Sequence, residues 1–248
     1  MKRWRQVFLV GWMLVVLAPL GAANLTADQI VDAMTTAMDY QDATFSATLV
    51  NTDRLGSTSL TFDTYQNARD DTLLVVTEGA DAGQKILRLD DDIYLYYPDA
   101  DEIIRLSGSS LKNAFLGTDF SYEDLTGDDD YTSRFTSTLN GTESIDGVSC
   151  YVITLTAKKL SEPYQMEKMW IDQQRFIPLK TELYSKSGKL LKVMTYQEYL
   201  HDGDVWFPGS IHVTNAVKKG NSSVMTVTNA TFNKGVDPSL FKKETLAW

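Results

Sequence analysis

Imidazole side chains, the usual general bases and metal ligands, are scarce in this sequence. His201 and His212 are its two histidines, and neither has a cysteine or carboxylate at the spacing that a metal site requires. Both fall in segments that we expect to be strands. Packing on a sheet surface is therefore favoured over metal binding or proton transfer.

The other groups that could do chemistry are equally isolated. Cys150 is the single cysteine, so it can form no disulfide within the chain, and the apolar neighbours Val152 and Ile153 indicate a buried strand. The acidic run at 128–130 lacks the glycine and the terminal glutamate of a calcium-binding loop. The chain also has no glycine-rich phosphate loop and no Gly-x-Ser-x-Gly motif.

These observations predict a protein without catalytic residues, bound metal or cofactor. A non-enzymatic binding protein is the favoured class. A hydrolase stays open as an alternative, because two carboxylates can meet across a sheet, as in a glycosidase, without leaving a sequence signature.

The N-terminus has the pattern of a secretory signal peptide. Three cationic residues within the first five are followed by an apolar run at 7–20 and by small residues at 21–23. The apolar run is short for a membrane span, which needs roughly 20 residues, although a retained anchor stays the alternative. We expect residues 1–23 to be cleaved near Ala23 and the mature protein to be exported.

The charge of the chain excludes some partners. Its 23 basic and 33 acidic residues give a net charge of -10, and loss of the cationic leader leaves an even more acidic mature chain. Such a surface repels nucleic acid and anionic lipid headgroups. A partner derived from a membrane would therefore have to be bound through its apolar part.

One helix is predicted directly after the leader. Thr26 and Gln29 have the spacing of a capping box, and Asp28 lies in the first turn, where the helix dipole favours an anion. One helical face is apolar and rich in methionine, at Ile30, Ala33, Met34, Ala37 and Met38. That face could pack into a core, or it could form a pliable cover over an apolar cavity.

Strands are predicted for most of the remaining chain. Short segments rich in Val, Ile, Thr, Tyr and Phe alternate with turn residues, and gaps this short join antiparallel neighbours. With no linker in the sequence, residues 24–248 are expected to form a single domain. The expected strands are 43–53, 57–67, 71–79, 83–90, 92–97, 101–107, 131–140, 147–157, 164–173, 176–186, 189–201, 204–216 and 220–233.

Two features suggest how this sheet is covered. The strands at 92–97 and 101–107 are apolar on both faces, whereas a sheet with water on one side alternates. We therefore expect the N-terminal helix to cover the second face of a strongly curved sheet. Residues 107–130 interrupt the strands and suit a long loop with a short helix, which is either a functional lid or a plug at one end of the barrel.

Several motifs together resemble one known family. The most specific is FLGTDFSYEDL at 115–125, and the earlier strands contain GQKILRL at 83–89, YLYYPD at 94–99 and IIRLSG at 103–108. Later strands contain MWID at 169–172, IPLK at 177–180, GKLLK at 188–192 and WFP at 206–208. The chain resembles the LolA-like periplasmic lipoprotein carriers, in the branch called outer-membrane lipoprotein-sorting protein.

The resemblance implies a mostly β fold, in which a single strongly curved antiparallel sheet forms an incomplete β-barrel covered by the N-terminal helix and the mid-chain lid. It also implies an apolar hollow that receives the acyl chains of lipoproteins or other lipids, with an inner-membrane transporter and an outer-membrane acceptor as possible partners. An adaptor of a membrane exporter, without lipid cargo, is the alternative. The lid-pinning arginine of the studied carriers has no match, so neither Arg88 nor Arg105 is assigned that role.

The side chains that we expect to line or cap the hollow are apolar and come from three segments. They are Met34 and Met38 of the helix, Tyr96 and Tyr97 of one strand, and Phe115, Leu116, Phe120 and Tyr122 of the mid-chain segment.

Overall fold

The computed structural model describes residues 25–69, 71–127 and 130–247. The predicted signal peptide at 1–23 lies outside these residues. Helices are few and short: α1 (Ala27–Met38), α2 (Tyr122–Thr126) and α3 (Tyr131–Arg134), with 3-10 turns at Gly108–Lys112, Phe115–Gly117, Pro238–Leu240 and Lys243–Thr245. The strands are β1 (Ala43–Asp53), β2 (Gly56–Gln66), β3 (Thr72–Glu78), β4 (Lys85–Leu89), β5 (Asp92–Tyr97), β6 (Glu102–Ser107), β7 (Phe135–Ile145), β8 (Val148–Ala157), β9 (Met166–Asp172), β10 (Pro178–Tyr184), β11 (Leu190–Gln197), β12 (Leu200–Asp202), β13 (Val205–Phe207), β14 (Ser210–Asn215) and β15 (Ser222–Phe232).

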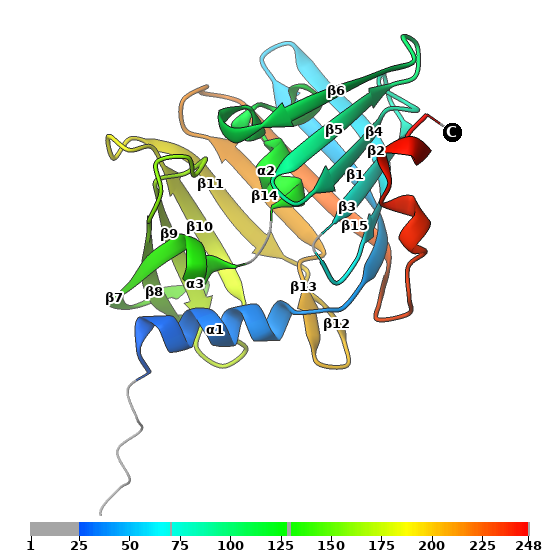
Figure 1. Cartoon of the computed structure of the whole chain (residues 1–248). Coiled ribbons are helices and arrows are strands. Elements are labelled where there is room, and N and C mark those ends of the chain that lie inside the picture. Colours follow the sequence, from blue (N-terminus) through cyan, green and yellow to red (C-terminus); the bar gives the residue numbers. More distant parts are fainter. Residues whose placement is uncertain (1–24, 70, 128–129, 248) are drawn as a thin grey trace, which may run out of the picture.

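Thirteen strands form one antiparallel sheet in the order β6-β5-β4-β3-β2-β1-β15-β14-β11-β10-β9-β8-β7, and β12 and β13 form a separate hairpin. The sheet is strongly curved and does not close, so β6 and β7 lie at its two edges (Figure 1). The expected mostly β, antiparallel incomplete barrel is therefore confirmed. Pairing of β1 with β15 joins the two ends of the chain at the middle of the sheet.

Two expected strands are broken where the hairpin leaves the sheet. The segment 189–201 divides into β11 and β12, and 204–216 divides into β13 and β14. Pro208 has no N–H to donate, and a Cβ on Gly209 would lie 2.2 Å from the carbonyl oxygen of Glu198, so only glycine fits there. Glu198 itself has a φ of 53°. These backbone features end β11 and release the hairpin.

Helix α1 packs across one end of the sheet. Its N-terminus has the predicted capping box, with Thr26 and Gln29 each bonded to the other's backbone N–H. The buried side chains Ile30 and Met34 contact a cluster on β7, β8 and β9 that includes Ile153 and Met169. The apolar helical face is thus partly core, as one of the two sequence interpretations required.

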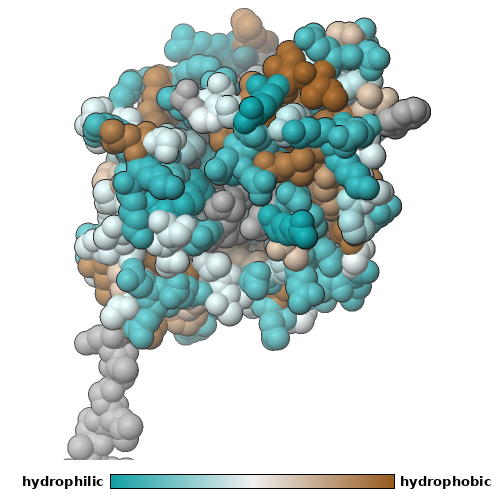
Figure 2. All heavy atoms as spheres, viewed as in Figure 1, coloured by the Kyte–Doolittle hydropathy of each residue, from teal (hydrophilic) through white to brown (hydrophobic). Residues whose placement is uncertain are grey.

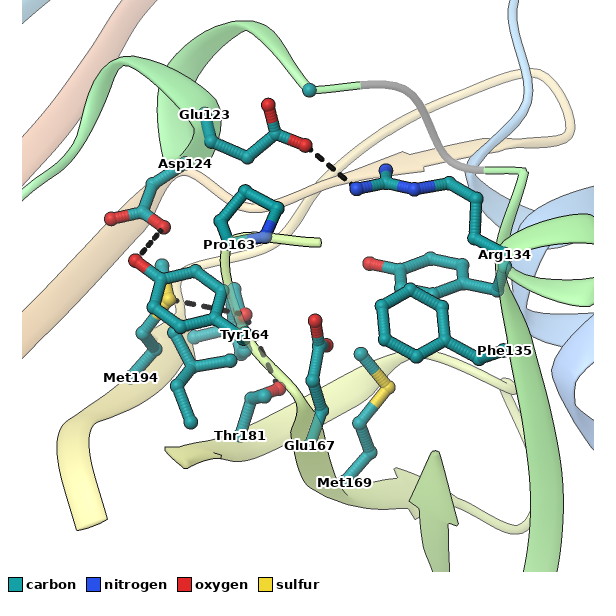
Figure 3. A pocket seen from close by; sticks show the side chains of 14 residues that line it. Glu123, Asp124, Arg134, Phe135, Pro163, Tyr164, Glu167, Met169, Thr181 and Met194 are labelled. Atoms are coloured by element: carbon teal, nitrogen blue, oxygen red, sulfur yellow. Dashed lines mark hydrogen bonds and ion pairs between the residues drawn. The ribbon is translucent and has the colours of Figure 1, made fainter. Parts of the chain in front are cut away.

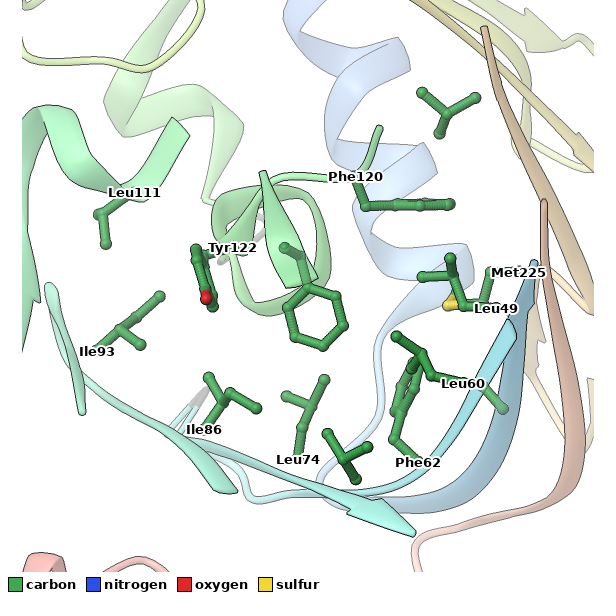
Figure 4. Close-up of a cluster of buried hydrophobic side chains, with 14 of the residues drawn as sticks. Leu49, Leu60, Phe62, Leu74, Ile86, Ile93, Leu111, Phe120, Tyr122 and Met225 are labelled. Atoms are coloured by element: carbon green, nitrogen blue, oxygen red, sulfur yellow. The ribbon is translucent and has the colours of Figure 1, made fainter. Parts of the chain in front are cut away.

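The mid-chain segment, residues 108–127, lies on the concave face of β1–β6 (Figures 1 and 4). Phe115 and Phe120 are fully buried among side chains such as Phe62, Leu74 and Ile86. The aromatic side chains of this segment therefore complete the core, as a plug would.

The second apolar face of β5 is covered by a different element from the one expected. Tyr94 and Tyr96 point away from the concave face and pack with Phe241 and Leu246 of the C-terminal segment, residues 236–247. The expectation that the N-terminal helix covers this face is wrong, because α1 lies at the other end of the sheet, against β7–β9. On β6, Ile103 and Ile104 stay about 40% exposed.

Candidate functional site

A cavity of about 190 Å³ lies between α1 and the concave face of the sheet. Its lining is mainly apolar and contains five of the chain's eight methionines. These are Met34 and Met38 from α1, Met169 from β9, Met194 from β11 and Met225 from β15. We call this space the methionine-lined cavity. Because the methionine side chain is unbranched and flexible, such a wall adapts to guests of different shapes.

Aromatic and aliphatic side chains complete the wall. Phe45 and Phe207 are partly buried and lie 5.1 Å apart, centroid to centroid. The remaining apolar lining consists of Tyr40, Phe62, Leu125, Tyr131, Pro178, Tyr196, Pro208 and Ile211.

The cavity opens beside the C-terminal end of α1. A groove of about 470 Å³ shares Thr35, Met38, Tyr40 and Gln66 with the cavity, and we call it the mouth. Three carboxylates, Asp32, Asp39 and Asp130, lie along this groove. The entrance to an apolar space is therefore surrounded by negative charge.

A charged layer borders the cavity where the mid-chain segment meets β9 and β11. The Glu123 carboxylate on α2 accepts hydrogen bonds from Arg88 at 3.0 Å and from Arg134 at 2.8 Å. Arg134 also pairs with Glu162, at 2.6 Å. Two arginines from separate elements, β4 and α3, thus hold α2 in place.

The next carboxylate on α2 makes a second set of contacts. Asp124 accepts hydrogen bonds from Lys192 of β11 at 2.6 Å and from the Tyr164 hydroxyl at 2.8 Å. Burial raises the pKa of Tyr164 well above its ordinary value, so its hydroxyl remains a donor. Asp124 therefore connects the mid-chain segment to the far half of the sheet.

Glu167 of β9 is a further carboxyl group of this layer, and it points into a small pocket that we call the inner polar pocket (Figure 3). The pocket has a volume of about 120 Å³ and shares Met169, Met194 and Tyr196 with the methionine-lined cavity. Glu167 is 8% exposed. Burial raises its pKa to about 8, with Asp124, Glu123 and Glu162 adding to the rise and Arg134 opposing it.

The structure distributes the expected lining residues over three places. Met34 and Met38 line the cavity. Tyr96 lies on the outer face with the C-terminal segment, whereas Tyr97 packs at the edge of the concave core. The four mid-chain residues, Phe115, Leu116, Phe120 and Tyr122, belong to the core beside the cavity and do not line it.

Phe115 still supports the cavity wall indirectly. Its ring lies 6.0 Å from that of Phe62, a lining residue, in an edge-to-face arrangement. Sequence reasoning missed the lining residues on the strands, including Met194 and Met225. The sequence feature that could have identified them is methionine at strand positions that face inward, where β-branched residues are usual.

The two histidines and the cysteine lie outside the methionine-lined cavity and the inner polar pocket. His201 stacks on Trp206 in the β12–β13 hairpin, with 4.0 Å between ring centroids. Cys150 is buried, and burial raises the pKa of its thiol, as expected for a core cysteine. Across residues 25–69, 71–127 and 130–247, no three His, Cys, Asp or Glu side chains are grouped to hold a metal ion. None of the helices in these ranges is long and apolar enough to cross a membrane.

Comparison with known proteins shows which family model the chain matches. A model of a family described as "-like: Uncharacterized protein" matches residues 68–248. No curated protein matches the chain in sequence.

Solved structures match over nearly the whole chain. A LolA superfamily protein from Nitrosomonas europaea has a TM-score of 0.75 and 25% identity, covering 89% of this chain and 99% of that one. A DUF1329 family protein from Desulfovibrio piger has a TM-score of 0.82, with 24% identity over 89% of this chain and 99% of its own. An outer membrane lipoprotein-sorting protein domain from Vibrio parahaemolyticus has a TM-score of 0.82, with 21% identity over 90% and 98%. These similarities confirm the LolA-like fold that the sequence motifs predicted.

Proposed function

We propose that this chain, which belongs to the family of uncharacterized proteins whose model matches residues 68–248, is a periplasmic carrier of acyl chains. Its cargo is a lipoprotein or another lipid, moved between the inner and outer membranes. Export by the signal peptide at 1–23 and a single carrier domain at 24–248 are part of this proposal.

The observation that carries the proposal is the methionine-lined cavity and its mouth. Ligand pockets usually have volumes of roughly 300–1,000 Å³, so about 190 Å³ is enough for only part of a long acyl chain. Five flexible methionine side chains on three strands and one helix can change rotamer and enlarge the space. The mouth beside α1 gives an acyl chain a route into the cavity.

The energetics of acyl chains favour transfer between apolar sites. Burial of one methylene is worth about 0.8 kcal/mol, so a sixteen-carbon chain released into water would lose on the order of 12 kcal/mol. Loading and unloading must therefore exchange a bilayer or a partner's pocket for this cavity. Small changes in cavity opening can then decide the direction of transfer.

The test is extraction of the purified mature protein with organic solvent, followed by mass spectrometry. We expect copurified lipid with apolar chains. In parallel, delipidated protein is incubated with vesicles of zwitterionic phospholipid that carry a pyrene-labelled acyl chain, and we expect label to move to the protein. A clean extract together with no transfer of label would contradict the carrier function.

An adaptor docked on a membrane transporter is the second candidate, because one edge strand of the sheet exposes two large apolar side chains. Ile103 and Ile104 are exposed on the edge strand β6, and Figure 2 shows apolar residues gathered where β6 lies in Figure 1. Exposed apolar edge strands can pair with a partner chain. This candidate predicts a protein partner captured by crosslinking in the cell envelope and no lipid in the extract.

A further inference from the structure

Glu167 is the one member of the charged layer that lacks a partner among the residues that the structure describes. The other three carboxylates are paired with Arg88, Arg134 or Lys192. No hydrogen bond or ion pair reaches the Glu167 side chain from the described residues, although it is 92% buried and points into the inner polar pocket (Figure 3). Among the described residues, the layer thus contains four carboxyl groups and three cations, one positive charge short of balance.

A buried carboxylate without a partner is costly, so Glu167 must either keep its proton or receive a cation. The charged groups that act on it are Arg134 from α3, Glu123 and Asp124 from α2, and Glu162 from the turn before β9. Without a ligand, the three neighbouring carboxylates favour the protonated form. A cationic ligand would reverse this preference.

The position of the pocket indicates that such a ligand carries an apolar chain in addition to its cation. The pocket shares Met169 and Met194 with the methionine-lined cavity, so a molecule could place an apolar chain in the cavity and its polar end beside Glu167. The mouth carries Asp32, Asp39 and Asp130, which attract cations and repel anionic headgroups.

We propose that the inner polar pocket binds a protonated primary amine attached to an acyl chain, with the Glu167 carboxylate as its ion-pair partner. The proposal rests on the carrier function above, because the methionine-lined cavity must accept the chain of the same molecule. It narrows the cargo to amine-bearing lipids or acylated amines.

Binding should then be linked to one proton. Below the pKa of about 8 that burial gives Glu167, arrival of the ammonium expels the carboxyl proton. Affinity should rise about tenfold per pH unit between about pH 6 and about pH 7.5, and level off above about pH 8. An alkylammonium keeps its charge throughout this range, since an amine such as that of lysine titrates near about 10.4.

The experiment uses four probes below their micelle concentrations, with calorimetric titration of the delipidated full mature chain. Dodecylammonium, dodecanoate and dodecanol share one chain, and ethylammonium carries the amine without it. We expect dodecylammonium to bind at least about tenfold tighter than the other two dodecyl probes, because it is the one dodecyl probe that can form an ion pair with the Glu167 carboxylate. Ethylammonium should not bind measurably.

Titrations in two buffers of different ionisation enthalpy should show release of close to one proton at neutral pH.

Glu167→Gln should abolish the amine preference and the proton release, so that dodecylammonium binds no tighter than dodecanol. Glu102→Gln, which removes the same charge from the exposed edge of β6, should change neither. Because the proton release is measured on the unaltered chain, the result does not depend on folding of a variant.

The outcomes separate the two proposals. If the three dodecyl probes bind equally, or if ethylammonium binds as tightly as dodecylammonium, the amine site attached to a chain is wrong while an acyl cavity can still stand. If no dodecyl probe binds, the carrier function itself fails.

Discussion

The guanidinium of Arg88 on β4 donates a hydrogen bond to the Glu123 carboxylate on α2 at 3.0 Å, with side chains that are 5% and 9% exposed. The contact joins residues 35 positions apart and fixes the mid-chain segment to the concave face. Glu123 keeps a second arginine, Arg134, on its other oxygen. The pair is therefore part of a buried network, in contrast to Arg105 and Asp92, where the arginine side chain is 60% exposed.

Replacement of Arg88 should destabilise the protein more than replacement of Arg105, because the Arg88–Glu123 ion pair is buried and Arg105 is exposed. Breaking a buried pair costs about 3–5 kcal/mol, and since Glu123 retains Arg134 we expect Arg88→Met to lower the free energy of unfolding by an amount near the lower value. Arg105→Met should cost less than about 1 kcal/mol. Urea denaturation of both variants measures the difference, and equal losses would show that the mid-chain segment is not held by this network.

Stability should decrease as pH rises through the titration of Glu167. Its folded pKa of about 8 lies above the ordinary 4.5, so the folded state holds a proton that the unfolded state has lost between these values. The free energy of unfolding should therefore fall by up to about 1.4 kcal/mol per pH unit until about pH 8. The groups with lowered pKa values, such as Asp172 and Glu182, act at lower pH.

Glu167→Gln should flatten this dependence and make the protein more stable than the unaltered chain at about pH 8 to 9. Chemical denaturation at several pH values between about 6 and 9 measures it. A variant curve parallel to that of the unaltered chain would mean that Glu167 ionises normally in the folded protein.

A charge at the mouth should block acyl uptake. Met38→Glu places a carboxylate in the lining of both the mouth and the cavity, beside Asp39, where an arriving chain would have to desolvate it. We expect transfer of a pyrene-labelled chain from vesicles to fall at least about tenfold, which corresponds to about 1.4 kcal/mol. Leu160→Glu, at a site that is 74% exposed and outside the lining of the cavity and the mouth, should transfer normally.

Phe120 should matter for stability more than for binding. Its side chain is fully buried in the concave core and does not line the cavity, so Phe120→Ala should lower the free energy of unfolding by about 3–5 kcal/mol. Ile104→Ala on the exposed edge should change it by about 0.5 kcal/mol or less. Acyl uptake per folded molecule should be preserved in Phe120→Ala. Selective loss of uptake, with stability intact, would return Phe120 to the binding site.

Local patterns in the sequence determined the elements themselves. The capping residues Thr26 and Gln29 fix where α1 begins, and alternation with turn residues identifies nearly every strand, because both signals depend on neighbours within a few positions. The short gaps between consecutive strands also indicated most of the strand pairings. The motif at 115–125 was specific enough to indicate the fold family that the comparisons confirm.

The tertiary structure decided which side of each element is used. From the sequence we expect Tyr96 beside the cavity, but the path of the C-terminal segment packs it against Phe241 and Leu246 on the outer face. Likewise, Met34 is brought to Met194 and Met225 by curvature of the sheet and by pairing of β1 with β15, contacts between residues far apart in the chain. Whether a buried carboxyl such as Glu167 has a partner depends on side chains from three other segments, α2, α3 and the turn before β9. Periodicity in a sequence says that a face is apolar, but what covers that face is set by the packing of distant segments.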